Sequence, residues 1–431
     1  MNITGQNNGS LREIMDNTLQ DLRNAEENNY LTAKVKGTVK VVDANKRGFV
    51  VALDYSTNAS GGYMNPAGGN LVTTNKPELD RMTANYQYVQ FGQEIDNENL
   101  ANSKAGHHVG ASAKAMATAK EMNRRLEFEE WYFCRGDGSQ VLADITAAVV
   151  IAAGATGVIA CSGARDGAGA WMVRVGQVVR VYDVTLATLK TVGTVVAKTS
   201  NQSFSLLCVS AVNIVDTDVI LPQGDANAPT TTGIKGLPYL VKASGPYFDK
   251  TLSNVPALQA IVDSATGTIT RTSMEQLYRR HNSIRNNKSG KTTAVVSPAR
   301  MSDYFTQFYA QNAAQVHVVG GERPNVDNGA ANREYTHFGQ PIDEYKFLHP
   351  KFWYNLDFKS FCRLTLKEAG AMLTPGGDYV QKIQGGNYAN AQQKWSDDFL
   401  EYLSVNPAKN SAFTALGFAG LPLLANDPFV G

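Results

Sequence analysis

The chain has 431 residues, of which 43% are apolar and 18% are charged. This length exceeds one ordinary core and predicts two or three packed units. The 40 basic and 39 acidic residues give a formal charge of +1, which argues against a dedicated nucleic-acid binder, because such proteins carry a basic excess. The N-terminus lacks the apolar stretch of a secretory signal, and the four scattered cysteines form no C-x-x-C pair.

The first part of the chain is polar and then becomes strand-like. Residues 1–34 predict an N-terminal arm with some helix. Residues 35–98 carry valine-rich runs, a middle rich in Gly and Asn, and an alternating segment from Tyr86 to Ile95 that is typical of a strand. This extended β-segment has few large apolar residues for its length. It cannot build its own core, so we expect another chain to cover it.

A long amphipathic helix is predicted next, from Ser103 to Arg135, within a segment assigned to residues 99–138. Apolar residues recur at helical spacing along one face. The predicted core of this helix is Ala115, Ala119, Met122, Leu126 and Phe133. Gly136 follows the helix and is predicted to be its left-handed C-terminal cap.

Residues 139–232 differ in composition from the rest, with no Glu between Glu130 and Glu275. Short alternating apolar runs at regular spacing predict a small β-sandwich or barrel. The predicted strands are Trp171–Val175, Gln177–Val184, Thr191–Ala197, Phe204–Val209 and Asp218–Leu221. The apolar stretch from Ile145 to Ala160 is too short to span a bilayer of ~30 Å and is interpreted as strand, turn and strand.

The remainder of the chain predicts mixed α and β structure over residues 233–375, followed by an aromatic C-terminal segment over 376–431. Helical patterns cover Met274–His281 and Ala299–Ala314, and strand patterns cover Thr292–Ser297, Ile342–Phe347 and Phe361–Leu366.

Motifs that carry chemistry are incomplete. Ser289–Thr292 ends like a phosphate-binding loop, but Arg285 stands where that loop needs its first glycine. His107 and His108 lack further ligands at suitable spacing. The carboxylates of Glu127, Glu129 and Glu130 are interpreted as a solvated helix face or as salt-bridge partners. The sequence therefore predicts no catalytic residue, cofactor or metal site.

The order of elements resembles major capsid proteins of the Hong Kong 97 phage type. Leu126–Leu142, Val175–Leu221, Gly233–Leu240 and Thr292–Arg300 look like successive parts of such proteins. The resemblance implies an α+β fold with an N-arm, an extended E-loop (35–98), a long spine helix (99–138), peripheral and axial domains (233–375) and an inserted small all-β domain (139–232). The implied protein is not an enzyme.

By this resemblance, the chain assembles into hexamers and pentamers of an icosahedral virion capsid built in the host cytoplasm. The shell encloses double-stranded DNA without sequence-specific binding and without a membrane. The implied partners are a separate scaffolding protein, a portal and, as a further candidate, a decoration protein. Another virion component (decoration or tail) and an encapsulin-type compartment shell are the alternatives. The candidate subunit-interface residues are Gly61, Gly62, Asn65, Gly68, Gly69, Tyr86, Tyr88 and Phe91.

Overall fold

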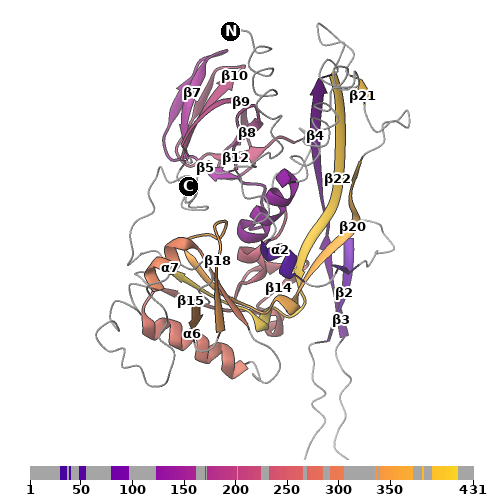
Figure 1. The fold of residues 1–431 in the computed structure, drawn as a ribbon, viewed down its shortest axis with the longest axis vertical. Coiled ribbons are helices and arrows are strands. Elements are labelled where there is room, and N and C mark those ends of the chain that lie inside the picture. Colours follow the sequence, from indigo (N-terminus) through magenta and orange to yellow (C-terminus); the bar gives the residue numbers. More distant parts are fainter. Residues whose placement is uncertain are drawn as a thin grey trace, which may run out of the picture.

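Figure 1 shows the chain as three parts arranged around a central helix: a sheet of long strands, a β-module beside one end of this sheet, and an α/β part beside the other. The fold comes from a computed structural model. It describes residues 30–35, 38–39, 48–54, 79–96, 123–161, 170, 172–200, 202–224, 233–265, 269–284, 292–304, 335–337, 340–371, 381–382 and 391–415.

The long strands form one five-stranded sheet in which β22 is central. Ten residues of β22 pair antiparallel with β4, and most of β22 pairs with β20. A separate antiparallel ladder of β2 and β3 continues toward the far end of the molecule (Figure 1). The bounds are β1 Thr38–Val39, β2 Gly48–Asp54, β3 Leu79–Asn85, β4 Gln87–Asp96, β20 Phe361–Ala371, β21 Gln381–Lys382 and β22 Ala391–Ser404.

The central helix covers residues 123–135 within the described part, and the short helix α2 (Tyr30–Lys34) lies beside it (Figure 1). Its last turns are buried because aromatic side chains from the helix and the long strands pack together. The ring of Phe133 lies 4.7 Å from that of Tyr402 and 6.1 Å from that of Phe361. Trp131 packs edge-on against Phe347. This aromatic cluster is the main core of the molecule.

The β-module, defined here as strands β5 to β12, is a six-stranded sheet with a small two-stranded ladder. The sheet order is β5-β12-β8-β9-β10-β7, and β6 pairs with β11. The module has its own core of mainly aliphatic residues, centred on Phe204 and Leu206. The bounds are β5 Ala143–Asp144, β6 Val149–Ile151, β7 Thr156–Ala160, β8 Val178–Tyr182, β9 Leu189–Ser200, β10 Ser203–Cys208, β11 Val212–Ile214 and β12 Val219–Pro222.

The α/β part contains a second six-stranded sheet, of order β15-β23-β19-β16-β18-β17, beside helices α6 (Arg271–Ile284) and α7 (Pro298–Tyr304). Helix α6 begins after Thr270, whose hydroxyl accepts from the Ser273 amide at 3.3 Å, as at a typical helix N-cap. The strands are β15 Ile261–Ala265, β16 Thr293–Val296, β17 Tyr335–His337, β18 Gln340–Glu344, β19 Phe352–Leu356 and β23 Ser411–Ala415.

Short elements connect these parts. They are α5 Leu237–Leu240, β13 Pro246–Tyr247, β14 Lys250–Thr251, and the 3₁₀ turns η2 Pro256–Leu258, η4 Phe358–Ser360 and η6 Pro407–Lys409. No helix within the described residues is long and apolar enough to cross a membrane.

One predicted strand is wrong. Residues 172–175 form turns, and β8 begins only at Val178. Val173 is nevertheless fully buried in the core of the β-module. The alternation that predicted a strand arises because Val173 packs in the core of the module, whereas Arg174 pairs with Glu127 of the central helix.

Candidate functional site

The 123–135 helix carries three carboxylates close together in the sequence, Glu127, Glu129 and Glu130. They contact three different parts of the chain. Glu130 is fully buried and accepts hydrogen bonds from the amides of Leu31 at 2.7 Å and Thr32 at 3.0 Å, and from the Thr32 hydroxyl at 2.5 Å. Burial raises the pKa of Glu130, and these hydrogen bonds oppose the rise. Glu130 therefore fixes α2 to the central helix.

Glu129 connects the same helix to the long sheet. Its carboxylate accepts from Arg363 Nε of β20 at 2.6 Å and also from the hydroxyl of Tyr402 on β22. Glu127 pairs with Arg174 of the β-module, with 2.6 Å between Oε1 and Nη2. The predicted solvated face is thus wrong, because all three carboxylates are buried, while the alternative of salt-bridge partners is correct for Glu127 and Glu129.

A fourth buried carboxylate, Glu401 of β22, holds the segment that leaves the β-module. It accepts from the Lys235 amide at 2.8 Å, from Lys235 Nζ at 2.8 Å and from the Tyr402 amide at 3.1 Å. Burial raises the pKa of Glu401, against the opposing effect of Lys235. The carboxylate is fully enclosed and also accepts from Gln87 Nε2 at 3.5 Å, so its charge depends on hydrogen-bond donors from the protein.

The chain enters and leaves the β-module through a pair of adjacent segments, residues 136–139 and 233–236, which we call the neck. Asp137 and Lys235 form an antiparallel bridge. The amide of Gly233 donates to the Gly138 carbonyl at 2.7 Å, and that of Gly236 to the Gly136 carbonyl at 2.9 Å. The two ends of the module are therefore held within hydrogen-bonding distance.

Glycines are required in the neck because backbones meet there. A Cβ on Gly136 would lie 2.4 Å from the Ile234 carbonyl oxygen and 2.5 Å from that of Tyr132. The predicted left-handed cap at Gly136 is wrong: the positive φ of 94° belongs to Gly138. Gly136 continues the helix pattern instead, since its amide donates to Tyr132 at 2.7 Å. Close packing, and not backbone handedness, explains this glycine.

The predicted interface residues fall into two groups. Gly61, Gly62, Asn65, Gly68 and Gly69 lie outside the described residues. Tyr86, Tyr88 and Phe91 lie on or beside β4. Phe91 packs edge-on against Phe128 of the central helix at 5.4 Å, whereas Tyr88 is 49% exposed. Of these three side chains, Tyr88 offers the largest exposed fraction for a contact with another chain.

The predicted helix core is described only at its C-terminal end. Phe133 is fully buried and Leu126 is half-buried. Ala115, Ala119 and Met122 lie outside the described residues. What sequence reasoning missed is the polar half of the same helix: the glutamates have no signature in sequence, because their partners lie about 50 to 270 positions away.

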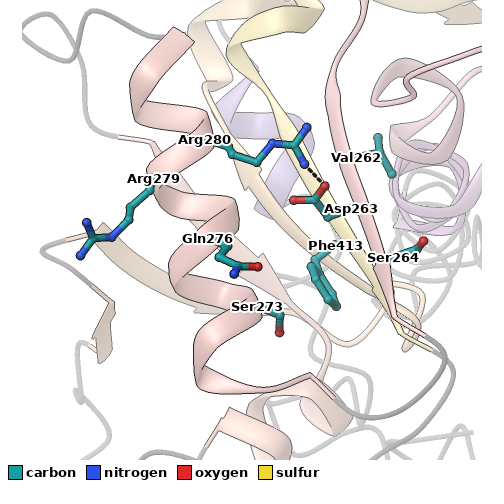
Figure 2. Close-up of a pocket in the computed structure, with 8 residues that line it drawn as sticks. All are labelled: Val262, Asp263, Ser264, Ser273, Gln276, Arg279, Arg280 and Phe413. Carbon is teal, nitrogen blue, oxygen red and sulfur yellow. Dashed lines mark hydrogen bonds and ion pairs between the residues drawn. The ribbon is translucent and has the colours of Figure 1, made fainter.

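One open groove accompanies the α/β part, between α6 and strands β15 and β23 (Figure 2). It has a volume of about 590 Å³, and Arg280 pairs with Asp263 across it. Ser273 lines the groove but is engaged with Thr270 in capping α6. The groove thus contains a surface ion pair and a capping serine, without an aligned nucleophile and base.

The other motifs carry no chemistry within the described residues. No cluster of three metal-ligating side chains occurs among them. His107, His108, Arg285 and Ser289 to Lys291 lie outside them. Thr292 is buried and leads directly into β16, where a phosphate-binding loop would need a helix.

Taken together, the described sheets, the central helix and the α/β part define a capsid fold of the Hong Kong 97 type, and comparison with solved structures supports this class. The chain is similar to a chain of the cyanophage A-1(L) capsid asymmetric unit, with a TM-score of 0.52 and 11% identity over 94% of this chain and 98% of that one. It also matches a chain from the capsid of the native GTA particle, with a TM-score of 0.47 and 11% identity over 93% of each chain. No protein-family model and no curated protein sequence matches.

Proposed function

We propose that this chain is the major capsid protein of a tailed bacteriophage. Its subunits would self-assemble into hexamers and pentamers that form the icosahedral head and enclose double-stranded DNA. The observation that carries the proposal is the match in fold to a cyanophage capsid chain, over 94% of this chain and 98% of that one. At 11% identity this match concerns the fold, so assembly has to be tested directly.

The parts of the chain receive roles under this proposal. Residues 35–98, which include β2, β3 and β4, act as the E-loop that lies on a neighbouring subunit. Residues 99–138 provide the spine helix of the peripheral domain. Residues 233–375 supply the axial domain, which meets its copies around the symmetry axes, together with strands of the peripheral domain. Residues 1–34 are the N-terminal arm, and 376–431 are the C-terminal segment.

The β2–β3 ladder supports the E-loop role on physical grounds. A two-stranded ladder is at best marginally stable in water by itself. Met82, in the middle of β3, and Ala84, near the end that adjoins β4, are fully buried. The ladder has no third strand among the described residues, so we expect a neighbouring subunit to supply a covering surface.

Residues 139–232 act as a domain inserted into this fold. The neck supports the proposal, because the segments by which the chain enters and leaves the module pair with each other. A separate core within the module supports it as well. A scaffolding protein and a portal are the partners that a head of this type would need, and a decoration protein is a further candidate.

The test is assembly of the full chain. Sedimentation velocity and negative-stain images of the fast fraction should reveal closed shells or sheets of hexamers, alone or after addition of a phage scaffolding protein. A monomer that responds to no scaffold would overturn the proposal. Shells that package protein cargo in place of DNA would favour the compartment-shell alternative.

Two variants connect the test to residues. Deletion of Gly61–Gly69 should leave a folded subunit that fails to close shells. Tyr88→Glu should do the same, because Tyr88 is half-exposed on β4. Val184→Glu is the matched control, since Val184 is equally exposed at 52% but lies in a turn of the β-module. Normal shells from both E-loop variants would refute the E-loop assignment.

A further inference from the structure

The outer edge of the β-module is strand β7, which, as far as the structure describes the chain, is covered on its outer side only at its last residue, Ala160, by Thr146. Strand β7 pairs only with β10 within the described residues, so it ends the six-stranded sheet. Figure 1 shows β7 on the side of the module that faces away from the long sheet. Natural edge strands are guarded by charges, prolines or bulges. The sequence has no charged residue between Asp144 and Arg165 and no proline there, and the β7–β10 register is regular.

The direction of the backbone groups on β7 follows from two hydrogen bonds. The Cys161 amide donates to Gln202, toward β10, at 2.7 Å. The Ala160 carbonyl accepts from Thr146, on the opposite side, at 3.0 Å. Because successive residues of a strand alternate in direction, the groups of Thr156 and Val158 also point away from β10. Within the described part of the chain, these two residues have no backbone partner on that side.

The side chains along this edge are also suited to contact. Val158 is 61% exposed. Gly157 lies between Thr156 and Val158, the two residues whose backbone groups point away from β10. Gly157 is required by the module itself, since a Cβ there would lie 2.5 Å from the Ile151 side chain. The edge therefore presents two N–H and two C=O groups, one exposed valine and a central glycine.

We propose that β7 pairs antiparallel with β7 of a second copy of this chain, across a two-fold axis at Gly157. In this register Thr156 of each copy exchanges both backbone hydrogen bonds with Val158 of the other, which satisfies the four open groups on each edge. The two six-stranded sheets would join into one continuous sheet.

A second copy is the occupant that the edge itself favours. The open groups are self-complementary about a two-fold axis, which is the requirement for an isologous contact. The absence of charge over residues 145–164 removes repulsion between identical edges. The proposed function enters only by supplying neighbouring copies, because two-fold axes recur between the subunits of a closed shell.

Disulfide trapping tests the register in assembled particles. Residues opposite each other in a hydrogen-bonded antiparallel pair have Cα atoms about 5.5 Å apart, within the range that a disulfide spans. Particles co-assembled from T156C and V158C subunits should give a disulfide-linked dimer on oxidation, several-fold more than particles of either variant alone. Wild-type particles and V192C particles are the controls, because Val192 is exposed on interior strand β9 of the same sheet.

Mixed particles without the dimer, or an equal yield of dimer from V158C alone, would overturn the proposed pairing. A chain that forms no particles would refute the proposed function instead, so the two failures are distinguishable. Val158→Pro provides a second measurement, since it removes an outward N–H that the module does not use. It should lower the yield of closed particles, and an unchanged yield would overturn the inference. If this variant does not fold, Val158→Lys serves the same test.

Discussion

The β-module and the rest of the molecule are both rich in strands, but their contacts join residues at very different separations in the sequence. The rest of the molecule, meaning the central helix, the long sheet and the α/β part, is called the body here. In the module, β8 pairs with β9 and β9 pairs with β10, around a cluster of apolar residues. In the body, β22 pairs with β4 roughly 300 positions away, and Glu129, Glu130 and Glu401 connect segments 98 to 273 positions apart. Local pairing suits a unit that folds alone, whereas the body requires nearly the whole chain.

The difference between the module and the body can be tested first by deleting the module. Replacing residues 140–230 by a short Gly-Ser bridge should leave the body folded, because Gly138 and Gly233 already lie within hydrogen-bonding distance. The body would lose the Glu127–Arg174 pair and the Tyr132–Gln140 hydrogen bond, at about 1 kcal/mol for each such contact. Calorimetry should show that one unfolding transition disappears while the other remains. Aggregation of the shortened chain would mean that the module belongs to the main core.

Among the single substitutions, the loss of a buried carboxylate should lower the free energy of unfolding of the body most. Glu401→Ala leaves Lys235 partly buried without its partner, and breaking a buried pair in this way costs about 3–5 kcal/mol. Urea unfolding would measure the loss. Glu275→Ala is the control, because the Glu275–Arg279 pair is largely exposed and is worth about 0.5 kcal/mol or less. Similar losses in both variants would show that the long-range carboxylate contributes no more than a surface pair.

The neck can be tested by adding one methyl group. Gly236→Ala would place Cβ 2.0 Å from the Tyr132 carbonyl oxygen and 2.4 Å from that of Phe133. The backbones would have to separate, at a cost of about 1–3 kcal/mol. Gly224→Ala is the control, because the atoms nearest to its Cβ would belong to the Arg180 guanidinium, the end of a side chain, and not to the backbone. Equal free energies of unfolding for the two variants would argue against a tight neck.

The same contrast explains what could be predicted from the sequence. Strands β9, β10 and β12 lie where alternating runs predict them, and β16 falls within the predicted Thr292–Ser297. Alternation between buried and exposed residues is a local property, so a local pattern reveals it. The turn around Val173 shows the same alternation without forming a strand, so the strand predicted there is wrong.

Long-range pairing left no comparable signal. The C-terminal segment reads as an aromatic tail, yet β22 is the central strand of the long sheet and β23 lies inside the second sheet. For the carboxylates of the central helix, the sequence left open a solvated face or salt bridges, because their partners at Thr32, Arg363 and Tyr402 cannot be identified by spacing. Among the candidate interface regions, the strand that carries Tyr88 could be predicted from the sequence. The exposed edge of β7 could not.

The smallest expected effect concerns the charge of Glu130. Its partners are the Leu31 and Thr32 amides, the Thr32 hydroxyl and Tyr345, none of them cationic. Burial raises its pKa above the ordinary value of 4.5, so the folded state holds a proton that the unfolded chain has already lost. Stability from this group is therefore complete below pH about 4.5 and is lost as the pH rises through the folded-state pKa.

Glu130→Gln removes this titration and leaves Glu401 and Glu344, whose pKa values burial also raises, unchanged. The free energy of unfolding of the wild type, relative to the variant, should thus fall as the pH rises from about 4.5. Each unit between the folded and unfolded pKa values corresponds to about 1.4 kcal/mol. Urea unfolding of both proteins between pH 4 and 8 measures the difference, with the shared groups cancelling. A difference that grows with pH would mean that the α2 amides stabilise the carboxylate more than burial penalises it, and the helix would then be held by charge.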